Sequence, residues 1–597
     1  MNLLGYNVGN AASTADLTET NRTNWQVGMN LHSIPVKLTQ EATFNADNSI
    51  KERKDYMLFG TTQGLLHVVD AKTGEESFAF VPNEMLENTQ QSKAFLDKAT
   101  GVKANMAYGI DGAWTIYSEY VYGMKALSSG SSSSAVVATV GEIKQGDQVL
   151  AKGKQIAYGG LRMGGRSYYA LDLSDLTRPK LKFHIDPDNN RIISLQADGS
   201  YKTTTNTVLA SMGQSWSKPT ITTVMYKGAA KRVMLVGGGY DMEYEKVTPS
   251  ISNTTRGRMI YMFDADNGDL LWYAGGDSAS TSCDQGDSNL GLRMKDLYSV
   301  VSRINAVDRD GDGITDHLYF GDLGGQVWRI DLGKDLGLKG GGCGRYSMLF
   351  KDSNSRFYEA PNFSVYGYEQ PLAVLSIASG NRSLPYSDKN SSSTIYNLFD
   401  QEVVSPNFVT TGNVNSSTPK LLVTDLKAML TAGDVKGKNL VQAKAMMPNG
   451  WYVLANTVVG KELDAQGNEI SLTNQVGSKV LNEMVVMNKS LYASVYNPNT
   501  SAGNGCKIQA NGATTVQRFC LPFGVCEQDV KDVTMSFGAG HGIVDSMVGA
   551  GIGLGDKNGL TRQLLNPNAK DKIGNSKLSV NTMRRQLVPL TWYERNE

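Results

Sequence analysis

The stretch LYFGDLGGQVWRID, residues 318–331, contains two short apolar runs joined by a glycine-rich turn, and the second run ends in aspartate. Short runs rich in aromatic and β-branched residues, bounded by Gly and Asp, are typical of β-strands. The stretch therefore predicts a hairpin in which one strand ends in glycine and the next runs into aspartate. That aspartate can accept backbone N–H bonds in the turn that follows it.

Three other parts of the chain repeat this unit. The paired strands are expected at residues 56–60 with 65–70, 155–160 with 168–172, and 233–238 with 260–264. A hairpin used at least four times predicts the blades of a β-propeller, whose faces are buried against neighbouring blades. The four aspartates, Asp70, Asp172, Asp264 and Asp331, are unevenly spaced. We therefore expect long insertions between blades, and the Ser-rich segment 128–134 should be a mobile surface loop.

An acidic loop, DRDGDGITD at residues 308–316, comes just before the hairpin quoted first. Ca²⁺ takes oxygen ligands, and a loop can supply them from positions 1, 3, 5, 7 and 9 when a glycine at position 6 allows a sharp turn. Gly313 stands at position 6, and the five ligand positions hold Asp308, Asp310, Asp312, Ile314 (through its backbone carbonyl) and Asp316. The sequence thus predicts a calcium site. A polar hairpin turn is the alternative, but turn chemistry alone does not require carboxylates at alternate positions.

The loop differs from an EF-hand in two ways. Position 12, where a bidentate glutamate is expected, is Tyr319. The flanking runs 304–307 and 317–320 are short and rich in aromatic or β-branched residues, which predicts strands and not helices. We therefore expect the ion in a loop between two strands, with water or another segment supplying the missing ligands.

Length and charge narrow the class of protein. A chain of 597 residues predicts several domains or one large repeat architecture. Lys and Arg together number 58, as do Asp and Glu, so no basic field attracts nucleic acid or an anionic membrane. The sequence contains no run of 18 apolar residues, so no membrane-spanning helix is predicted. Residues 1–24 lack the charged and then apolar segments of a signal peptide. If the protein acts outside the cell, we expect its export signal on a portion not included here, which would make this sequence a fragment.

The five cysteines are Cys283, Cys343, Cys506, Cys520 and Cys526. In an oxidising compartment they would form two local disulfides and leave one thiol. Cys283 and Cys343 flank the acidic loop, and we predict that they pair, which would stabilise the fold by a few kcal/mol. There is no C-x-x-C motif and the five histidines are scattered, so zinc is not expected.

Short motifs occur in one order along residues 26–500: GTTQGLLH (60–67), DAKTGEE (70–76), FVP (80–82), DG (111–112), GGLRMGG (159–165), SKP (217–219), GDLGGQVWRID (321–331) and QP (370–371). With the acidic loop, this set resembles the C-terminal region of the PilY/PilC family of type IV pilus tip-associated adhesins and assembly factors. The motif GWY at 450–452, with the strands of 483–496, is similar to the last blade of that family.

The resemblance implies an all-β, quinoprotein-like modified seven-bladed β-propeller over residues 26–500. Residues 1–25 are then a flexible N-terminal segment, and the Cys- and Gly-rich residues 501–597 close or pack on the propeller. It also implies Ca²⁺ held by Asp308, Asp310, Asp312, Asp316 and the Ile314 carbonyl, with occupancy influencing pilus extension and retraction. The implied partners are minor pilins, the N-terminal portion of the same protein and a host-cell or surface receptor. The implied location is extracellular, at the pilus tip and associated with the outer membrane.

Two other functions remain as alternatives. The turns Asp70–Gly74 and Asp264–Gly268 resemble those of quinoprotein dehydrogenases, but such enzymes use a disulfide between adjacent cysteines, which this chain lacks. We therefore predict a protein that is not an enzyme. A generic extracellular propeller that binds a ligand and uses calcium only as a brace is the second alternative. Arg162, Arg166 and Tyr168 are interpreted as residues of turns and of contacts between blades.

Overall fold

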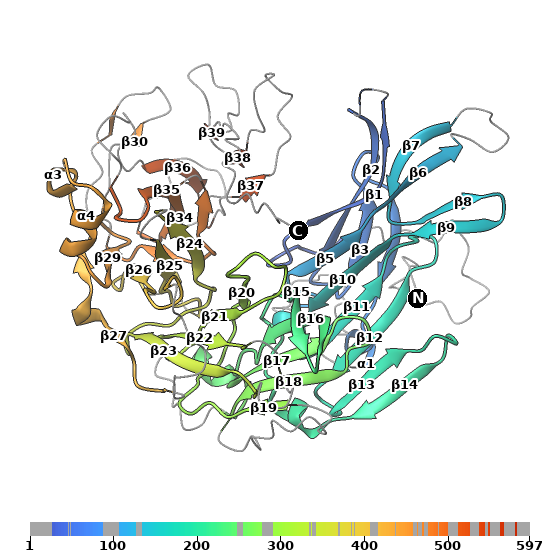
Figure 1. The fold of residues 1–597 in the computed structure, drawn as a ribbon, viewed down its shortest axis with the longest axis horizontal. Helices are drawn as coiled ribbons and strands as arrows, with labels where there is room; N and C mark the ends of the chain where they lie inside the picture. Colours follow the sequence, from blue (N-terminus) through green and yellow to red (C-terminus); the bar gives the residue numbers. More distant parts are fainter. Residues whose placement is uncertain are drawn as a thin grey trace, which may run out of the picture. The chain divides into compact units, whose positions relative to one another are not determined.

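Strands dominate the described part of the chain, with a few short helices (Figure 1). The structure is a computed structural model, and it describes residues 27–45, 47, 49–87, 107–126, 134–246, 255–276, 290–333, 336, 342–367, 371–383, 385–386, 388–405, 416–435, 437–457, 462–463, 469–470, 476–487, 489–499, 512–525, 536–541, 543, 547–549, 562–565 and 579–581. The predicted all-β class is confirmed. The predicted N-terminal segment 1–25, most of the Ser-rich loop, and Cys283, Cys506 and Cys526 lie outside the described residues.

The chain divides into two compact units. Unit 1 comprises Met1–Asp322, Arg329–Tyr346 and Asn413–Ser417, and unit 2 comprises Leu323–Trp328, Ser347–Gly412 and Thr418–Glu597. The domain bounds expected from the sequence, at residues 25 and 500, remain predictions.

Three large sheets follow one another along unit 1. The first has the strand order β4-β3-β2-β1-β7-β6, the second β14-β13-β12-β11-β10-β5, and the third β15-β16-β17-β18-β19. The strands of the first are β1 (Val36–Phe44), β2 (Ile50–Gly60), β3 (Leu66–Asp70), β4 (Glu76–Phe80), β6 (Val121–Ala126) and β7 (Ser134–Thr139). Those of the second are β5 (Trp114–Glu119), β10 (Lys154–Gly160), β11 (Tyr168–Asp172), β12 (Lys180–Asp186), β13 (Arg191–Leu195) and β14 (Tyr201–Thr205). Those of the third are β15 (Thr220–Tyr226), β16 (Ala229–Gly237), β17 (Met259–Asp264), β18 (Leu270–Gly275) and β19 (Leu290–Leu292).

A fourth sheet has the order β20-β21-β22-β23-β27, and the predicted hairpin 318–331 forms its strands β21 and β22. Its strands are β20 (Asn305–Val307), β21 (His317–Gly321), β22 (Gln326–Asp331), β23 (Arg345–Lys351) and β27 (Leu421–Leu422). All four predicted hairpin units thus occur, each as the pair of neighbouring strands that the sequence indicates.

Two further sheets belong to unit 2, with the orders β24-β25-β26-β29-β28 and β32-β34-β35-β36, and β33 pairs with β34. Their strands are β24 (Asn362–Tyr366), β25 (Leu372–Ala378), β26 (Thr394–Phe399), β28 (Lys427–Ala428), β29 (Gly450–Leu454), β32 (Lys479–Val480), β33 (Val485–Met487), β34 (Ser490–Asn497), β35 (Ala513–Cys520) and β36 (Ser536–His541). The expectation that 450–452 and 483–496 share a blade is wrong, because β29 pairs with β26 whereas β34 pairs with β35. Strand β35 also shows that residues beyond 500 contribute to a sheet.

The smaller elements lie between or after these sheets in the sequence. They are the hairpins β8 (Glu142–Gln145) with β9 (Gln148–Lys152) and β30 (Glu462–Leu463) with β31 (Glu469–Ile470), the sheet of β37 (Met547–Gly549), β38 (Arg562–Leu565) and β39 (Ser579–Asn581), and the helices α1 (Asn83–Glu87), α3 (Ala432–Val435) and α4 (Leu440–Met446).

The inner strand β10 of the second sheet of unit 1 is buried on both faces. Side chains alternate between the faces of a strand, and on β10 Tyr158 joins one apolar cluster while the neighbouring Ala157 joins another. The Tyr158 cluster includes Val236 of the third sheet, and the Ala157 cluster includes Leu58 of the first sheet. A strand covered on both faces is apolar throughout, which explains the apolar runs in the predicted hairpins. Successive sheets therefore stack face to face, as propeller blades do.

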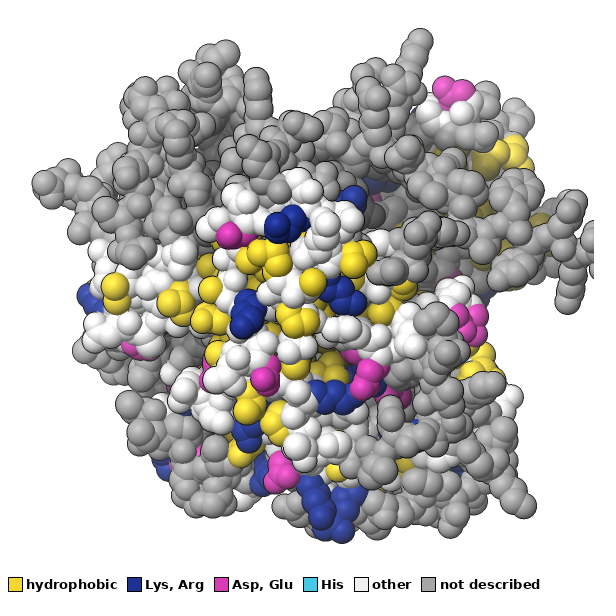
Figure 2. Space-filling model, turned by 60° about the vertical axis from the view of Figure 1, so that its left-hand side comes forward, with side chains coloured by type: hydrophobic (Ala, Val, Ile, Leu, Met, Phe, Trp, Pro, Cys, Tyr) yellow, Lys and Arg dark blue, Asp and Glu magenta, His cyan; other side chains and the backbone are white. Residues whose placement is uncertain are grey.

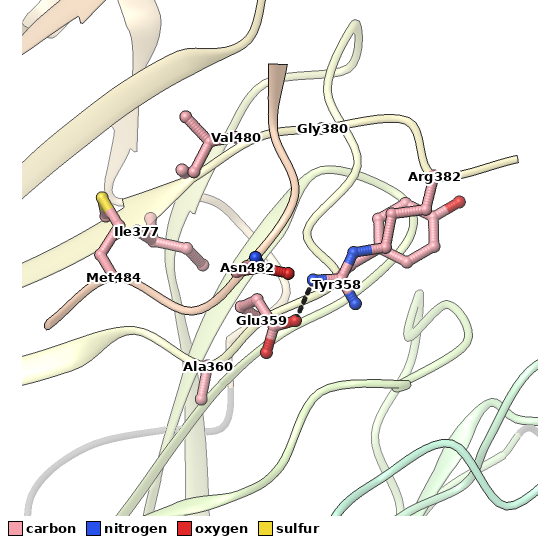
Figure 3. Close-up of a pocket in the computed structure, with 10 residues that line it drawn as sticks. Tyr358, Glu359, Ala360, Ile377, Gly380, Arg382, Val480, Asn482 and Met484 are labelled. Carbon is pink, nitrogen blue, oxygen red and sulfur yellow. Dashed lines mark hydrogen bonds and ion pairs between the residues drawn. The ribbon is translucent and has the colours of Figure 1, made fainter. Parts of the chain in front are cut away.

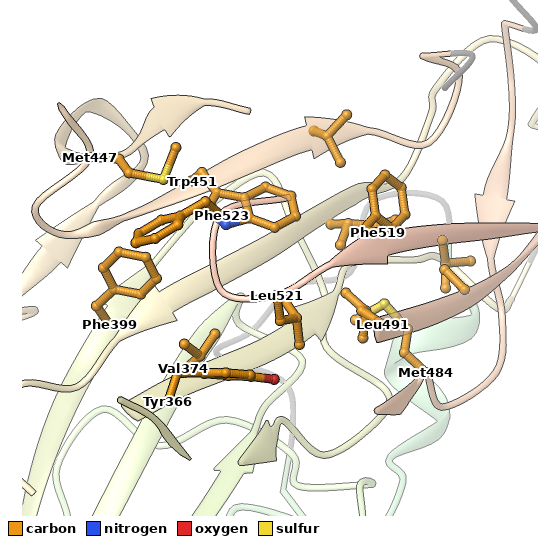
Figure 4. Close-up of a cluster of buried hydrophobic side chains, with 14 of the residues drawn as sticks. Tyr366, Val374, Phe399, Met447, Trp451, Met484, Leu491, Phe519, Leu521 and Phe523 are labelled. Carbon is orange, nitrogen blue, oxygen red and sulfur yellow. The ribbon is translucent and has the colours of Figure 1, made fainter. Parts of the chain in front are cut away.

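Unit 2 repeats this stacking around Trp451, which is fully buried (Figure 4). Trp451 and Phe399 come from the first sheet of this unit, and Leu491 and Phe519 come from the second. The indole Nε1 of Trp451 donates a hydrogen bond of 2.7 Å to the carbonyl oxygen of Pro522, so its polar group is satisfied inside the cluster.

Three of the four aspartates that end a predicted hairpin make the expected turn. Asp70 accepts hydrogen bonds from the backbone N–H groups of Lys72 and Thr73, Asp172 from that of Ser174, and Asp264 from that of Asp266, at 2.8 to 3.0 Å. Asp331 instead binds other side chains, described with the acidic loop below.

The interpretation of Arg162, Arg166 and Tyr168 as turn and inter-blade residues is confirmed. Arg162 forms an ion pair of 2.8 Å with the buried Asp111. The Nε of Arg166 and the hydroxyl of Tyr168 donate to the carbonyl oxygens of Met212 and Ser217, at 2.9 and 3.0 Å, in the segment that leads into the third sheet.

A half-buried carboxylate connects helix α1 to the second sheet and gives a pH prediction. Glu84 lies 3.2 Å from Nε2 of His184 and accepts a hydrogen bond from the hydroxyl of Tyr169. Burial alone would raise the pKa of Glu84, but the hydrogen bond and charge of His184, with hydrogen bonds from Ser167 and Tyr169, lower it from the usual 4.5 to about 2.

The contacts that lower the pKa of Glu84 stabilise the fold only while Glu84 is ionised. Glu84→Gln should therefore lower the free energy of unfolding by about 2 kcal/mol at neutral pH. That difference should be complete above the unfolded pKa of about 4.5 and should shrink as the pH falls towards about 2. Urea unfolding of both proteins between these pH values measures it. An equal difference at every pH would contradict this assignment.

The drawn face of the molecule in Figure 2 carries Lys and Arg side chains interspersed with Asp and Glu and with apolar groups. Such mixing agrees with the formal net charge of zero. In the part of the chain that the structure describes, no helix has the length and apolar character needed to cross a membrane.

Candidate metal site

The acidic loop connects β20 to β21, which are antiparallel and begin their pairing at Val307 with His317. The predicted strand–loop–strand arrangement is therefore confirmed, and the flanks are not the helices of an EF-hand. Asp316 closes the loop, since its backbone N–H donates to the carbonyl oxygen of Val307 at 2.9 Å.

Three of the predicted ligands come together. One carboxylate oxygen from each of Asp308, Asp310 and Asp316 lies within 4.8 Å of the others. Asp312 does not belong to this group, and its Oδ1 accepts a hydrogen bond of 2.7 Å from the backbone N–H of Ile314. The loop thus presents three convergent carboxylates, with Asp312 engaged in shaping the turn.

The carboxylates also fold the loop around themselves. The two oxygens of Asp308 accept from the N–H groups of Gly311 and Gly313 at 2.7 and 2.8 Å, and Asp316 accepts from the N–H of Arg309 at 2.7 Å. Gly311 and Gly313 have φ angles of +80° and +88°, which favour glycine. This explains why the sequence places glycine between the aspartates.

The electrostatics of the loop favour a cation. Burial raises the pKa of Asp316, and the nearby charges of Asp310 and Asp308 raise it further, although the N–H of Arg309 and the charge of His317 oppose them. Like charges at this separation disfavour full ionisation unless a positive charge lies among them. An all-oxygen set of carboxylates suits a hard cation such as Ca²⁺, so the residues present fit the predicted ion.

A buried charged group lies next to the loop and was missed by the sequence interpretation. Asp331 lies 2.7 Å from Nδ1 of His317 and 2.9 Å from Nε of Arg329, and all three side chains are buried. Burial would raise the pKa of Asp331, but the hydrogen bond from His317 and the charge of Arg329 lower it below its usual value. Arg329 and Asp331 are two residues apart on β22 and so lie on one face of the sheet. That spacing was the one feature of the sequence that could have indicated the ion pair.

Cys343 is disulfide-bonded, and its carbonyl oxygen accepts a hydrogen bond of 3.0 Å from Nε1 of the buried Trp272. Cys520 is disulfide-bonded as well. Because Cys283 lies outside the described residues, the pairing of Cys283 with Cys343 stays a prediction. Peptide mapping without reduction should recover residues 283 and 343 in one linked peptide pair. Recovery of Cys343 linked to another cysteine would contradict it.

Two hollows in the described residues differ in their capacity to hold other ligands. In unit 2, Tyr358, Glu359, Arg382, Asn482 and Met484 help to line a cavity of about 10 Å³, across which Glu359 and Arg382 form an ion pair (Figure 3). That volume is close to what one water molecule requires, so the cavity is too small for an organic cofactor.

In unit 1 an open groove of about 700 Å³ lies among β1, β2, the β8–β9 hairpin and the turn after β11. Its lining is polar and mixed in charge, and it includes Lys54, Glu142, Asp175, Arg178 and Lys180. Its volume lies within the range of about 300–1,000 Å³ that is usual for ligand sites.

No family model matches the chain. The type IV pilus biogenesis factor PilY1 homolog of Xylella fastidiosa is 24% identical over 367 residues, which cover 58% of this chain and 19% of that protein. PilY1 of Pseudomonas aeruginosa strain UCBPP-PA14 is 23% identical over 284 residues, covering 47% of this chain and 17% of that protein. The resemblance to the PilY/PilC family is confirmed. The chain spans less than a fifth of the length of these PilY1 relatives.

The crystal structure of the Pseudomonas aeruginosa PilY1 C-terminal domain matches the fold, with a TM-score of 0.50 and 17% sequence identity over 89% of this chain and 93% of that one. This chain therefore shares the fold of the PilY1 C-terminal domain. The match covers nearly all of both chains, in agreement with the order of motifs along residues 26–500.

Proposed function

We propose that this chain is the C-terminal propeller-type domain of a type IV pilus biogenesis factor and that it acts as a non-catalytic part of the pilus machinery. The observation that carries the proposal is the agreement of two independent likenesses: sequence relatives named for pilus biogenesis and a fold shared with the PilY1 C-terminal domain. The implied partners are minor pilins and the remaining portion of the same protein, and the implied place is the pilus tip at the cell surface.

We further propose that the acidic loop binds one Ca²⁺ and that its occupancy regulates pilus extension and retraction. Asp308, Asp310 and Asp316 would hold the ion directly, because their oxygens already converge. The carbonyl of Ile314, another predicted ligand, would complete the shell with water. Asp312, the remaining predicted ligand, would instead hold the turn through its hydrogen bond from the N–H of Ile314. When bound, the ion supplies positive charge that relieves the repulsion among the three carboxylates. The residues of the loop then act as a brace or a switch and not as catalysts.

Pilus assembly and motility of bacterial strains that carry altered forms of the full-length protein test this function. The full-length protein would be compared in its native host with a form lacking this domain and with Asp308→Ala/Asp310→Ala. We expect loss of surface pili and twitching motility in the first, and pili with altered calcium dependence of motility in the second. Unchanged piliation and motility without the domain would exclude the pilus role, while an unchanged response in the aspartate variant would exclude calcium regulation.

Adhesion is a second candidate function, favoured by the groove in unit 1. We propose that it receives a polar surface ligand, such as a carbohydrate or peptide, because its lining offers both cations and hydroxyl groups. Arg178→Ala/Lys180→Ala should reduce attachment of purified protein to cells several-fold. Exposed Lys202 on β14, outside the groove, offers a matched control when changed to Ala. Equal attachment by all three proteins would contradict the assignment.

A further inference from the structure

Thr315 is the buried residue of an otherwise largely exposed loop. Residues 308–313 are exposed, whereas Thr315 is only 4% exposed although it directly precedes Asp316. Its backbone N–H donates to the carbonyl oxygen of Thr223 at 2.8 Å, and its hydroxyl lies 2.6 Å from that of Thr222. The acidic loop is therefore fastened to a strand about 90 residues earlier in the sequence.

That strand, β15, is one of the two edge strands of the third sheet. It also holds the other side of the loop region, because the hydroxyl of Thr220 donates to the carbonyl oxygen of Ile304 at 2.7 Å, just before β20. Thr220 and Thr222 are two residues apart on β15 and so lie on one face of it. Threonines of the third sheet thus form hydrogen bonds with the chain on both sides of the acidic loop, which belongs to the fourth sheet.

The hydrogen bonds between Thr315 and β15 affect the position of Asp316, a proposed ligand. Asp316 is the next residue after Thr315, and its N–H is held by Val307 while its carbonyl oxygen accepts from Leu332 at 2.9 Å. Movement of Thr315 away from β15 would therefore shift the Asp316 backbone relative to Asp308 and Asp310. Conversely, an ion that draws the three carboxylates together would hold Thr315 against Thr222 and Thr223.

We propose that Thr222 and Thr315 are positioning residues for the metal loop, and that they couple calcium occupancy to the contact between β15 and the loop. The inference rests on the proposed calcium site and adds the route by which the ion would act on the fold. Coupling of this kind is reciprocal: the contact favours the ion as much as the ion favours the contact. Mere protection of the edge of β15 would stabilise the sheet without any link to calcium.

The test measures calcium affinity by titration calorimetry for the parent chain, Thr222→Val, Thr315→Val and the double variant. Valine has nearly the shape of threonine but lacks the hydroxyl, so the contact between the two hydroxyl groups is lost while the N–H of Thr315 can still donate to Thr223. We expect each single change to weaken affinity about 3- to 10-fold, with the double change close to either single one because both remove the same contact. Thr203→Val on the exposed part of β14 is the control and should leave affinity unchanged.

A second measurement needs no variant. Hydrogen exchange of the Thr315 amide in the parent chain should slow several-fold on adding calcium, because that N–H bonds to Thr223. Parent protein that binds calcium while its Thr315 exchange and the affinity of Thr222→Val stay unchanged would overturn the coupling and leave the site intact. Parent protein that takes up no calcium would overturn the site itself, and the coupling with it.

Discussion

Asp308→Ala should lower the calcium affinity of this chain by at least about 100-fold while unit 1 stays folded, because removing one of the charged ligands of a loop site weakens it strongly. Asp308 has two tasks in the loop. It contributes an oxygen to the convergent group with Asp310 and Asp316, and it accepts from the N–H groups of Gly311 and Gly313. Its loss removes a ligand and also loosens the turn that brings the others together. The remainder of the sheet does not depend on it, since the loop is exposed.

Asp312→Ala is the matched comparison, because it removes the same charge from the same loop. Its oxygen accepts from the N–H of Ile314 and does not join the convergent group. We therefore expect a loss of affinity below about 10-fold, from lost charge and a looser turn. Titration calorimetry on both variants, with circular dichroism to verify the fold, gives the answer. Equal losses for Asp308→Ala and Asp312→Ala would contradict the division of roles among the aspartates.

Asp331→Ala should destabilise unit 1 by about 3–5 kcal/mol, the cost of breaking a buried ion pair by removing one partner. The carboxylate accepts from His317 and pairs with Arg329, which is fully buried. Without it the buried guanidinium of Arg329 would lose the counter-charge of Asp331. The midpoint of urea unfolding should fall accordingly.

Asp70→Ala is the control for this prediction, because Asp70 ends the equivalent hairpin of the first sheet. Its carboxylate accepts from exposed groups of its own turn, among them the backbone N–H groups of Lys72 and Thr73. Its loss should cost about 1 kcal/mol, the usual net value of hydrogen bonds of this kind. Comparable losses for Asp70→Ala and Asp331→Ala would show that Asp331 is an ordinary turn residue.

Local patterns predicted most of what is local in this fold. The hairpins, the turns at Asp70, Asp172 and Asp264, and the strand–loop–strand setting of the acidic loop follow from residues close together in sequence. The four hairpin units were found because glycine and aspartate mark their ends in each case.

Contacts between segments far apart in the sequence were not predicted. The partners of Asp331 depend on which face of β22 meets His317. The contact of Thr222 with Thr315 joins a strand of one sheet to a loop of the next sheet. Likewise, β29 pairs with β26 and not with the strands of 483–496, a choice of partner between separate segments that local sequence patterns do not specify. The separation of Asp312 from the other carboxylates is a matter of loop geometry that a ligand pattern does not specify.

Direct calcium binding by the parent chain tests the central claim. Equilibrium titration at physiological ionic strength should show one Ca²⁺ per chain with a Kd at or below about 10⁻³ M, the weak end for extracellular modules. Crystals grown with calcium should then place the ion among Asp308, Asp310 and Asp316. No uptake at that concentration, or an ion bound elsewhere with these carboxylates unchanged, would contradict the account.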